Sequence, residues 1–265
     1  MISDLAYVHP DARLGRDVTV EPFAFIEGDV EIGDRCWIGT GAVIRNGARM
    51  GCECRVHTGA VVSGIPQDLK FDGEYSTVEM GDRNTVRECA TINRGTRAKG
   101  RTLIGDDNLI MSYAHIAHDC TIGNHCVIVS SVLLAGEVEV GDWAVIGGNA
   151  AVHQFTRIGA HAMIGGGALV GKDVPPFVLA GRYPVTYQGA NVIGLRRRGF
   201  TSEQITAIQG IFRVLFQSGH SYNKGVDMVL EQFPPSPERD AVVEFIRSSK
   251  RGILKPFNPF AEQDD

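Results

Sequence analysis

Two histidines and an aspartate stand close together in the segment 114–120, which reads AHIAHDC. A histidine is the usual general base near neutral pH, because its unperturbed pKa is about 6.5. The carboxylate of Asp119 can orient the ring of His118 and stabilise the imidazolium that forms when this ring accepts a proton. We therefore take His118 as a candidate general base, Asp119 as its partner and His115 as a further site residue. The alternative is that all three are solvated surface residues.

The elements that position these residues follow from a repeat of six. Aliphatic residues recur at this spacing from Ile2 to Val170, and 26 of the 29 positions hold Ile, Leu, Val or Met. The three exceptions are Asp68, Glu74 and Ala98, which fall in two segments predicted as loops, 63–77 and 94–101. A period of six fits neither an α-helix nor an alternating strand, and it indicates a parallel β-helix.

Three such units make one triangular coil of 18 residues, with the aliphatic side chains inside the prism. The next position is often glycine, which we expect to serve an unusual backbone conformation at the turn. These glycines are Gly15, Gly33, Gly39, Gly51, Gly81, Gly105, Gly123, Gly141, Gly147, Gly159, Gly165 and Gly171. Residues 18 apart become vertical neighbours about 4.8 Å apart. Gly136 then lies over His118, where its N–H could stabilise an oxyanion, and Glu137 lies over Asp119.

A helical pattern replaces the repeat near the end of the chain. Residues 201–204 (TSEQ) resemble a capping box, and a second helix is predicted with Ser236 as N-cap and Pro237 at its first position. We therefore predict two domains, a parallel β-helix over 1–190 with its two loops, and a small α-helical domain over 191–265.

Composition excludes several classes of protein. The net charge is −5, which argues against a general affinity for nucleic acid or anionic membrane. No apolar run approaches the roughly 20 residues that span a bilayer, so we expect no stable membrane insertion. The first residues have neither the basic nor the apolar region of a signal peptide, so we expect a cytoplasmic protein. The six cysteines show no CxxC pair and are expected to be buried or half-buried thiols.

Eight segments resemble the UDP-N-acetylglucosamine O-acyltransferases, in the same order along almost the whole chain. They are 67–70 (QDLK), 92–96 (INRGT), 106–109 (DDNL), 114–120 (AHIAHDC), 146–148 (IGG), 151–155 (AVHQF), 173–176 (DVPP) and 194–200 (GLRRRGF). The resemblance implies a left-handed β-helix, a homotrimer with sites in the clefts between prisms, and no metal or other cofactor. It implies transfer of a 3-hydroxyacyl chain from acyl carrier protein to the 3-hydroxyl of a UDP-sugar, UDP-N-acetylglucosamine, at the start of lipid A synthesis.

The resemblance also assigns roles. His118 is the implied base, Asp119 its paired acid and Gly136 the backbone donor to the thioester oxyanion. Gly166 is implied to limit acyl-chain depth. The loop with Asp68 is implied to meet the sugar and phosphates from across a subunit interface. The other implied substrate-binding residues are Gln67, Lys70, His115, His153, Gln154, Asn191 and Arg197. The basic run 196–198 suits an acidic carrier or a diphosphate, or it is a solvated patch.

Two departures from the family keep alternatives open. Glu137 replaces a common histidine, and Pro184 falls near another position where relatives often have one. An N-acyltransferase of the same fold, acting on a 3-amino UDP-sugar, is therefore the main alternative. A non-catalytic scaffold and a sugar acetyltransferase dependent on acetyl-CoA are two others. A zinc site of His115, His118 and His153 is also conceivable, because one branch of hexapeptide proteins binds zinc, but the spacing does not favour it.

Overall fold

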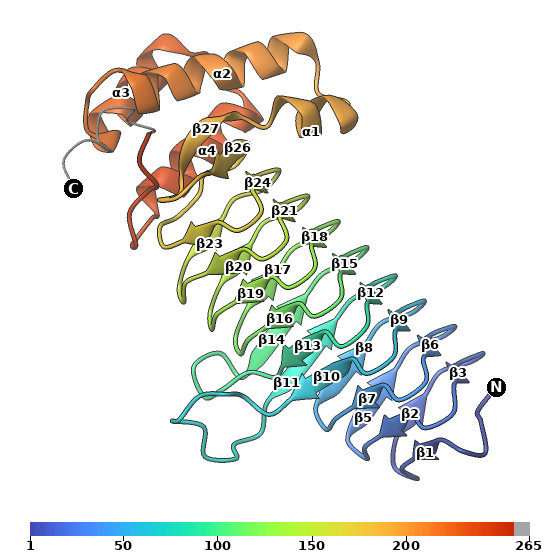
Figure 1. Cartoon of the computed structure of the whole chain (residues 1–265). Coiled ribbons are helices and arrows are strands. Elements are labelled where there is room, and N and C mark those ends of the chain that lie inside the picture. Colours follow the sequence, from blue (N-terminus) through green and yellow to red (C-terminus); the bar gives the residue numbers. More distant parts are fainter. Residues whose placement is uncertain (257–265) are drawn as a thin grey trace.

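A computed structural model describes residues 1–256 of the chain. It is a three-sided prism of short parallel strands with helices at one end (Figure 1). We name each of the three sides by the number of strands in its sheet. The nine-stranded sheet contains β1 (Tyr7–Val8), β4 (Phe25–Ile26), β7 (Val43–Ile44), β10 (Val61–Gly64), β13 (Thr91–Asn93), β16 (His115–Ile116), β19 (Leu133–Leu134), β22 (Ala151–Val152) and β25 (Leu169–Val170).

The other two sides follow the same order. The eight-stranded sheet contains β2 (Arg13–Leu14), β5 (Val30–Ile32), β8 (Ala48–Met50), β11 (Thr77–Met80), β14 (Arg101–Ile104), β17 (Thr121–Ile122), β20 (Glu139–Val140) and β23 (Arg157–Ile158). The ten-stranded sheet contains β3 (Thr19–Val20), β6 (Trp37–Ile38), β9 (Arg55–Val56), β12 (Thr85–Val86), β15 (Leu109–Ile110), β18 (Val127–Ile128), β21 (Val145–Ile146), β24 (Met163–Ile164), β26 (Val178–Gly181) and β27 (Thr186–Ala190). The predicted fold class, a left-handed parallel β-helix followed by a small helical region, is confirmed.

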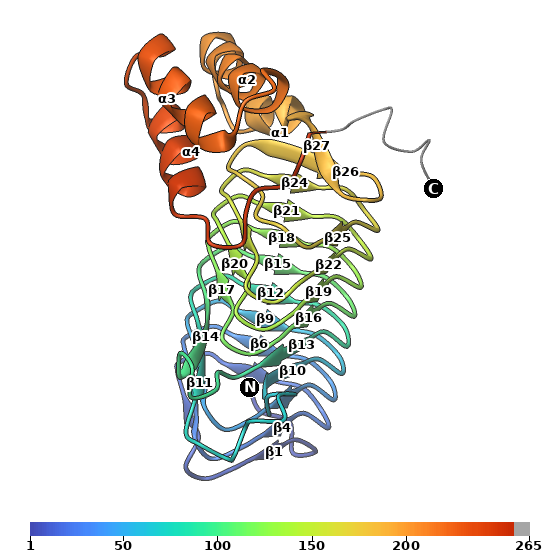
Figure 2. The same cartoon turned by 90° about the vertical axis from the view of Figure 1, so that its left-hand side faces the viewer.

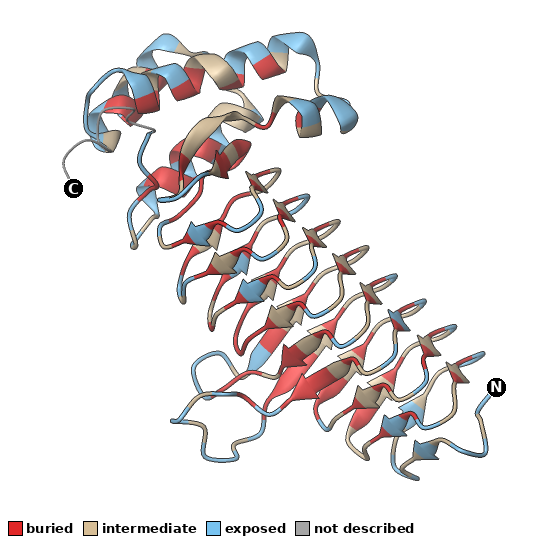
Figure 3. Cartoon of the chain, viewed as in Figure 1, coloured by how far each residue is buried: buried red, intermediate tan, exposed pale blue. Residues whose placement is uncertain are grey.

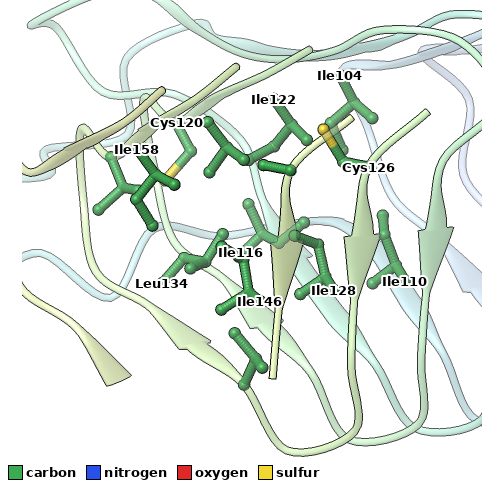
Figure 4. Packing of buried hydrophobic residues seen from close by; sticks show 14 of the residues in the cluster. Ile104, Ile110, Ile116, Cys120, Ile122, Cys126, Ile128, Leu134, Ile146 and Ile158 are labelled. Atoms are coloured by element: carbon green, nitrogen blue, oxygen red, sulfur yellow. The ribbon is translucent and has the colours of Figure 1, made fainter. Parts of the chain in front are cut away.

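The repeated aliphatic residues fill the prism. Ile116, Ile128 and Leu134 are fully buried and lie among the side chains that converge in Figure 4. Burying each such side chain contributes about 1.5–3 kcal/mol, so the stacked coils hold one another in register. Cys120 and Cys126 belong to the same core, where burial raises the pKa of each thiol to about 12.

The expected reason for the glycine column is wrong. None of these glycines has a positive φ; in every turn but the last, the left-handed residue comes two positions later, as at Arg35 (φ 58°) and Asp107 (φ 58°). Most of these glycines are needed because the next coil lies too close. A Cβ on Gly33 would stand 2.6 Å from the carbonyl carbon of Gly51. Steric approach between coils, and not backbone freedom, therefore selects glycine here.

Both loops project from the same corner of the prism, between the nine-stranded and the eight-stranded sheets (Figure 1). We call it the His118 corner. One loop joins β10 to β11 and the other joins β13 to β14. Strand partners on most coils are 18 residues apart, but across the loops the offset is larger: Val61 pairs with Thr91, and Thr91 pairs with His115. The insertions therefore lengthen the corner and leave the ladder of strands intact.

Most strands have inward residues that are buried and outward residues that are half-buried or exposed (Figure 3), and the type of the outward residues differs between the three sides. On the eight-stranded sheet they are mostly charged, and Arg13 pairs with Glu31 on the next coil. On the other two sheets they are mostly apolar. The nine-stranded sheet presents Tyr7, Phe25, Val43, Val61, Leu133 and Leu169, and the ten-stranded sheet presents Leu109, Val127, Val145, Met163 and Leu179. Apolar surface of this extent is typical of faces that associate.

Four helices follow the last strand: α1 (Val192–Arg197), α2 (Ser202–Gln217), α3 (Tyr222–Gln232) and α4 (Pro237–Arg247). The capping box between Thr201 and Gln204 is confirmed, and so is the Ser236 cap before Pro237. Sequence reasoning missed α1 and α3. In α3, a Ser221 cap was a usable signal. Among residues 1–256, no helix has the length and apolar character that crossing a membrane requires.

The chain beyond α4 returns to the prism. It runs back along the outside of the coils, beside the eight-stranded sheet (Figure 2), and Ile253 forms a parallel bridge with Asp173. At the end of the prism, β27 pairs antiparallel with β26, and α2 packs on β27 through a stack of Phe216 on Tyr187 with centroids 4.2 Å apart. The helices are thus fixed to the coils at two places.

The glycine argument gives a stability prediction. We expect Gly33→Ala to lower the free energy of unfolding by about 1–3 kcal/mol, because the added methyl group overlaps backbone atoms of the next coil. Gly171→Ala is the matched control, since Gly171 occupies the same repeat position with nothing within 4 Å of an added Cβ. We expect it to stay within about 0.5 kcal/mol of the parent in denaturant unfolding. Equal effects of the two changes would contradict the steric explanation.

Candidate active site

The candidate base and its acid lie at the His118 corner, directly after β16. The Nδ1 atom of His118 and the Oδ2 atom of Asp119 are 2.8 Å apart. His118 is 8% exposed and Asp119 is fully buried. Asp119 occupies the left-handed turn position (φ 59°), which turns its carboxylate back beneath the ring. The two residues therefore form one oriented pair.

The second loop satisfies the buried carboxylate of Asp119. The backbone N–H of Thr96 donates to it at 3.0 Å, the Thr96 hydroxyl at 2.6 Å and the backbone N–H of Lys99 at 3.1 Å. A buried carboxylate is stable only when such donors replace its water. Sequence reasoning missed Thr96, because the insertion breaks the offset of 18 that relates neighbouring coils.

Asp68 and Gly136 lie at the other edge of the ring. The Oδ2 atom of Asp68 is 3.9 Å from Nε2 of His118. A Cβ on Gly136 would stand 2.5 Å from this same Nε2 atom. The His118 ring therefore packs directly against the backbone of Gly136 and leaves no room for a side chain there. Asp68 belongs to the first loop of the same chain, whereas we expected this loop to arrive from a neighbour. Lys70 and Gln67 are exposed on that loop, and the Lys70 N–H donates to Asp68 at 3.0 Å.

His115 lies on the outward side of β16, one strand position before the corner. Its Nδ1 atom is 2.7 Å from the hydroxyl of Thr91. Burial lowers the pKa of His115, and the nearby charge of His118 lowers it further. The contact with Thr91 thus fixes the orientation of the His115 ring beside the pair, and its surroundings favour the neutral form.

Gln154 and His153 stand on the following coil. The pairing of Leu133 with Ala151 puts Gln154 in the column above Gly136. His153 is exposed, and its Nδ1 atom is 3.0 Å from the carbonyl of Gln154.

The remaining predicted residues lie at other corners. Asn191 caps α1 and donates from Nδ2 to the carbonyl of His161 at 2.9 Å. Arg197 borders a neighbouring groove of about 570 Å³ beside Met163. Gly166 lies at the third corner, between the ten-stranded and nine-stranded sheets, and is exposed. A single chain therefore does not bring these three residues to His118.

A ring stack at the corner of Asn191 was not predicted. His125, Trp143, His161 and Phe177 are successive neighbours in this stack, which defines the Trp143 corner. The guanidinium carbon of Arg198 lies 5.6 Å above the Trp143 ring, so the stack attaches the end of α1 to the prism. The first three rings are 18 residues apart, which is the signal that could have revealed them.

No metal centre is formed within residues 1–256, where no three His, Cys, Asp or Glu side chains cluster in a way that could hold an ion. The site instead combines the oriented imidazole of His118, the carboxylate of Asp68 and the backbone of Gly136. This combination can accept a proton from an alcohol and stabilise an oxyanion.

Stacked hexapeptide coils with such a pair at one corner define a class of acyltransferases. The family model "Bacterial transferase hexapeptide (six repeats)" matches residues 101–136. The model "Udp N-acetylglucosamine O-acyltransferase; Domain 2" matches residues 173–254, which include all four helices.

Comparison with individual proteins is more specific. The chain is 58% identical over 200 residues to an acyl-(acyl-carrier-protein)–UDP-N-acetylglucosamine O-acyltransferase of Chlorobaculum parvum, covering 74% of this chain and 76% of the relative. A UDP-N-acetylglucosamine acyltransferase structure from Bacteroides fragilis superposes with a TM-score of 0.95 at 48% identity, over 96% of this chain and 100% of the other. The Francisella novicida enzyme gives 0.94 at 37%, over 99% and 96%. The chain belongs to this acyltransferase family, as the sequence resemblance predicted.

The Thr96 contact gives a second prediction. We expect Thr96→Val to lower both stability, by about 1–3 kcal/mol, and turnover, because the buried carboxylate loses its shortest donor. Thr96→Ser keeps the hydroxyl and should restore most of both. Denaturant unfolding and initial-rate assays on the two variants provide the measurement. If Ser and Val behaved alike, the hydroxyl would not support Asp119.

The ring stack gives a pH prediction. Burial, with the charge of Arg198 second, lowers the pKa of His161 to about 4, from 6.5. Below pH 6.5 the unfolded chain binds a proton that the folded chain excludes, so stability falls as the pH drops towards 4. Because the ring is half-open to solvent, we expect a loss of about 1–2 kcal/mol. His161→Phe keeps the stack and should unfold at denaturant midpoints that change less between pH 7 and 4.5; an unchanged slope would contradict this.

Proposed function

We propose that this chain transfers a 3-hydroxyacyl group from acyl carrier protein to the 3-hydroxyl of UDP-N-acetylglucosamine, the first step of lipid A synthesis. The names of its relatives supply the acceptor and the carrier. The observation that carries the proposal is the His118 ring, held by the buried Asp119 with its Nε2 edge beside Asp68 and Gly136. The reaction needs a base, an alcohol and an activated ester.

In the proposed reaction, Nε2 of His118 accepts the proton of the sugar 3-hydroxyl. The sugar oxygen attacks the thioester carbonyl carbon, and the C–S bond then breaks. The leaving thiolate takes the proton back from His118, so the products are an ester and the carrier thiol. Asp119 stabilises the imidazolium between these steps. The charge-assisted contact at 2.8 Å supports this role.

Gly136 is proposed as the oxyanion donor. Its N–H forms no hydrogen bond within the described part of the chain, whereas its carbonyl accepts from Phe155 at 3.2 Å. The peptide passes beside the Nε2 edge of His118, where the tetrahedral intermediate would form. Donors already in place cost no reorganisation during the reaction.

The acceptor and acyl sites are completed by further residues in this proposal. Asp68 is close enough to Nε2 of His118 for one sugar hydroxyl to contact both atoms, and in this proposal Lys70 and Gln67 extend the loop towards the phosphates. Gly166 remains the proposed limit to acyl-chain depth. The residues proposed around the nucleotide are His115, His153, Gln154, Asn191 and Arg197.

We also infer a homotrimer from the surface of the prism. The outward residues of the nine-stranded and ten-stranded sheets are apolar, and these two sheets meet at the Gly166 corner. Three prisms that pack these sides against one another leave the charged eight-stranded sheets in water. The His118 corner of one chain then borders the Trp143 corner of the next, which carries Asn191 and Arg197. This arrangement would unite residues that one chain keeps apart.

Glu137 favours one alternative acceptor. Its backbone N–H donates to the His118 carbonyl at 2.9 Å, so its half-exposed side chain emerges beside the base. A carboxylate there attracts a cationic 3-amino group on the sugar more than a hydroxyl. An N-acyltransferase with the same base is therefore the second candidate.

One assay separates the two acceptors. The enzyme is incubated with 3-hydroxyacyl carrier protein and either UDP-N-acetylglucosamine or its 3-amino analogue, and the product is followed by mass spectrometry. We expect the O-acyl product, with a loss of at least 10²-fold in His118→Ala. His220→Ala, at an exposed histidine of the helical region, is the control. Product from the amino sugar alone would favour the alternative, and no product from either would overturn both.

Gly136 provides a separate test of the geometry. We expect Gly136→Ala to reduce turnover by at least 10²-fold, because the new methyl group would lie 2.5 Å from the His118 ring and displace it. Gly148→Ala is a milder control at the equivalent turn position of another corner, where the nearest atom to an added Cβ is 3.3 Å away. Similar rates for Gly136→Ala and the parent would contradict the proposed placement of base and donor.

A further inference from the structure

A second cavity of about 660 Å³ opens directly above the His118 corner. Glu137 and Lys99 line it, and each is one hydrogen bond from the candidate pair: the Glu137 N–H donates to His118 and the Lys99 N–H to Asp119. The exposed ring of Phe155 forms an apolar part of its wall. The cavity therefore adjoins the proposed active site.

Cations from three distant segments converge on this cavity. They are Lys99 of the second loop, Arg157 of β23, and Lys250 and Arg251 of the returning segment after α4. The protein as a whole carries a net charge of −5, so this concentration of positive charge is local. The acids that line the same cavity are Glu137, Glu139 and Asp173.

Two of these acids, Asp173 and Glu139, are occupied in ways that leave Lys250 and Arg251 available. Asp173 is buried, and it accepts from the backbone N–H of Arg157 (2.9 Å) and from Ser249 (2.7 Å). Glu139 lies between Lys99 (3.7 Å) and Arg157 (3.4 Å).

Lys250 and Arg251 stand on the segment that Asp173 anchors. Within residues 1–256, Lys250 forms no ion pair, and the Arg251 side chain bonds only to the carbonyl of Gly171, at 2.8 Å. Lys172 adds a third cation beside them, through its contact with the Arg251 carbonyl at 2.9 Å. The rim is therefore positive and held in place by the buried Asp173.

We propose that this rim is the docking surface of the acidic acyl carrier protein, with the carrier's pantetheine arm passing over Phe155 to the thioester position at Gly136. The inference rests on the proposed function, and it adds the surface by which the enzyme recognises its acyl donor, the loaded carrier protein. The cavity wall belongs to the charged eight-stranded sheet, so a carrier can approach it from water without entering a face between subunits. Charge complementarity of this kind guides and orients association.

The test compares two double variants of equal charge. Lys250→Gln with Arg251→Gln removes the rim cations, and glutamine can still bond to the Gly171 carbonyl. Arg213→Gln with Lys224→Gln removes two exposed cations from α2 and α3. Binding of purified holo acyl carrier protein is measured by calorimetry at low salt, and transfer is measured from both acyl carrier protein and acyl-pantetheine, which lacks the carrier.

We expect the rim variant to bind the carrier at least tenfold more weakly and to show a KM for acyl carrier protein raised as much. Its transfer from acyl-pantetheine should equal that of the parent, and the control variant should match the parent in every assay. Unchanged carrier binding in the rim variant, or equal losses in both variants, would overturn the docking surface while leaving the acyltransferase proposal intact. Absence of transfer from either donor by the parent would instead overturn the proposed function, and the binding result would still decide the surface.

Discussion

The stacking of aliphatic side chains inside the prism is the interaction on which everything else depends. Each coil is held against the next at the strand spacing of about 4.8 Å. Residues that are distant in the sequence thereby become fixed neighbours in space, as His118 and Gly136 do. The chemistry needs a base and a donor at a constant separation. A close-packed interior provides that constancy without any dedicated interaction between the two residues.

The polar part of the site is added at one corner. Two loops leave the prism there, and one supplies donors to Asp119 while the other brings Asp68 towards His118. The aliphatic core cannot hold a carboxylate unaided, because burial without donors is costly. The second loop therefore supplies the hydrogen-bond donors that the buried carboxylate of Asp119 needs and that the regular coils do not provide. In the same way, the returning segment after α4 supplies a donor to the buried carboxylate of Asp173, through the hydroxyl of Ser249.

The period of six was enough to predict the strands, the core, both loops and the placement of Gly136 over His118. It failed where the offset of 18 fails: Thr96 meets Asp119 across 23 residues, a contact that no repeat encodes. It also gave the wrong reason for the glycines, because close approach of coils depends on stacking in space. Helix α3 escaped notice since Gly225 interrupts its apolar pattern and only its Ser221 cap signals it. The proposed association of chains rests on the outward residues of the strands, about which the inward period of six carries no information.

The insertions at the His118 corner have a consequence for how such a site can vary. Because the ladder of strands continues unbroken past them, the first loop can change in length or sequence without shifting the coils that carry His118 and Gly136. The second loop is more restricted, since it must keep the donors that hold Asp119. What covers the candidate base is thus separable from the coils that place it. The prism supplies a constant frame for His118 and Gly136, and the first loop is the part of this corner that can diversify on its own.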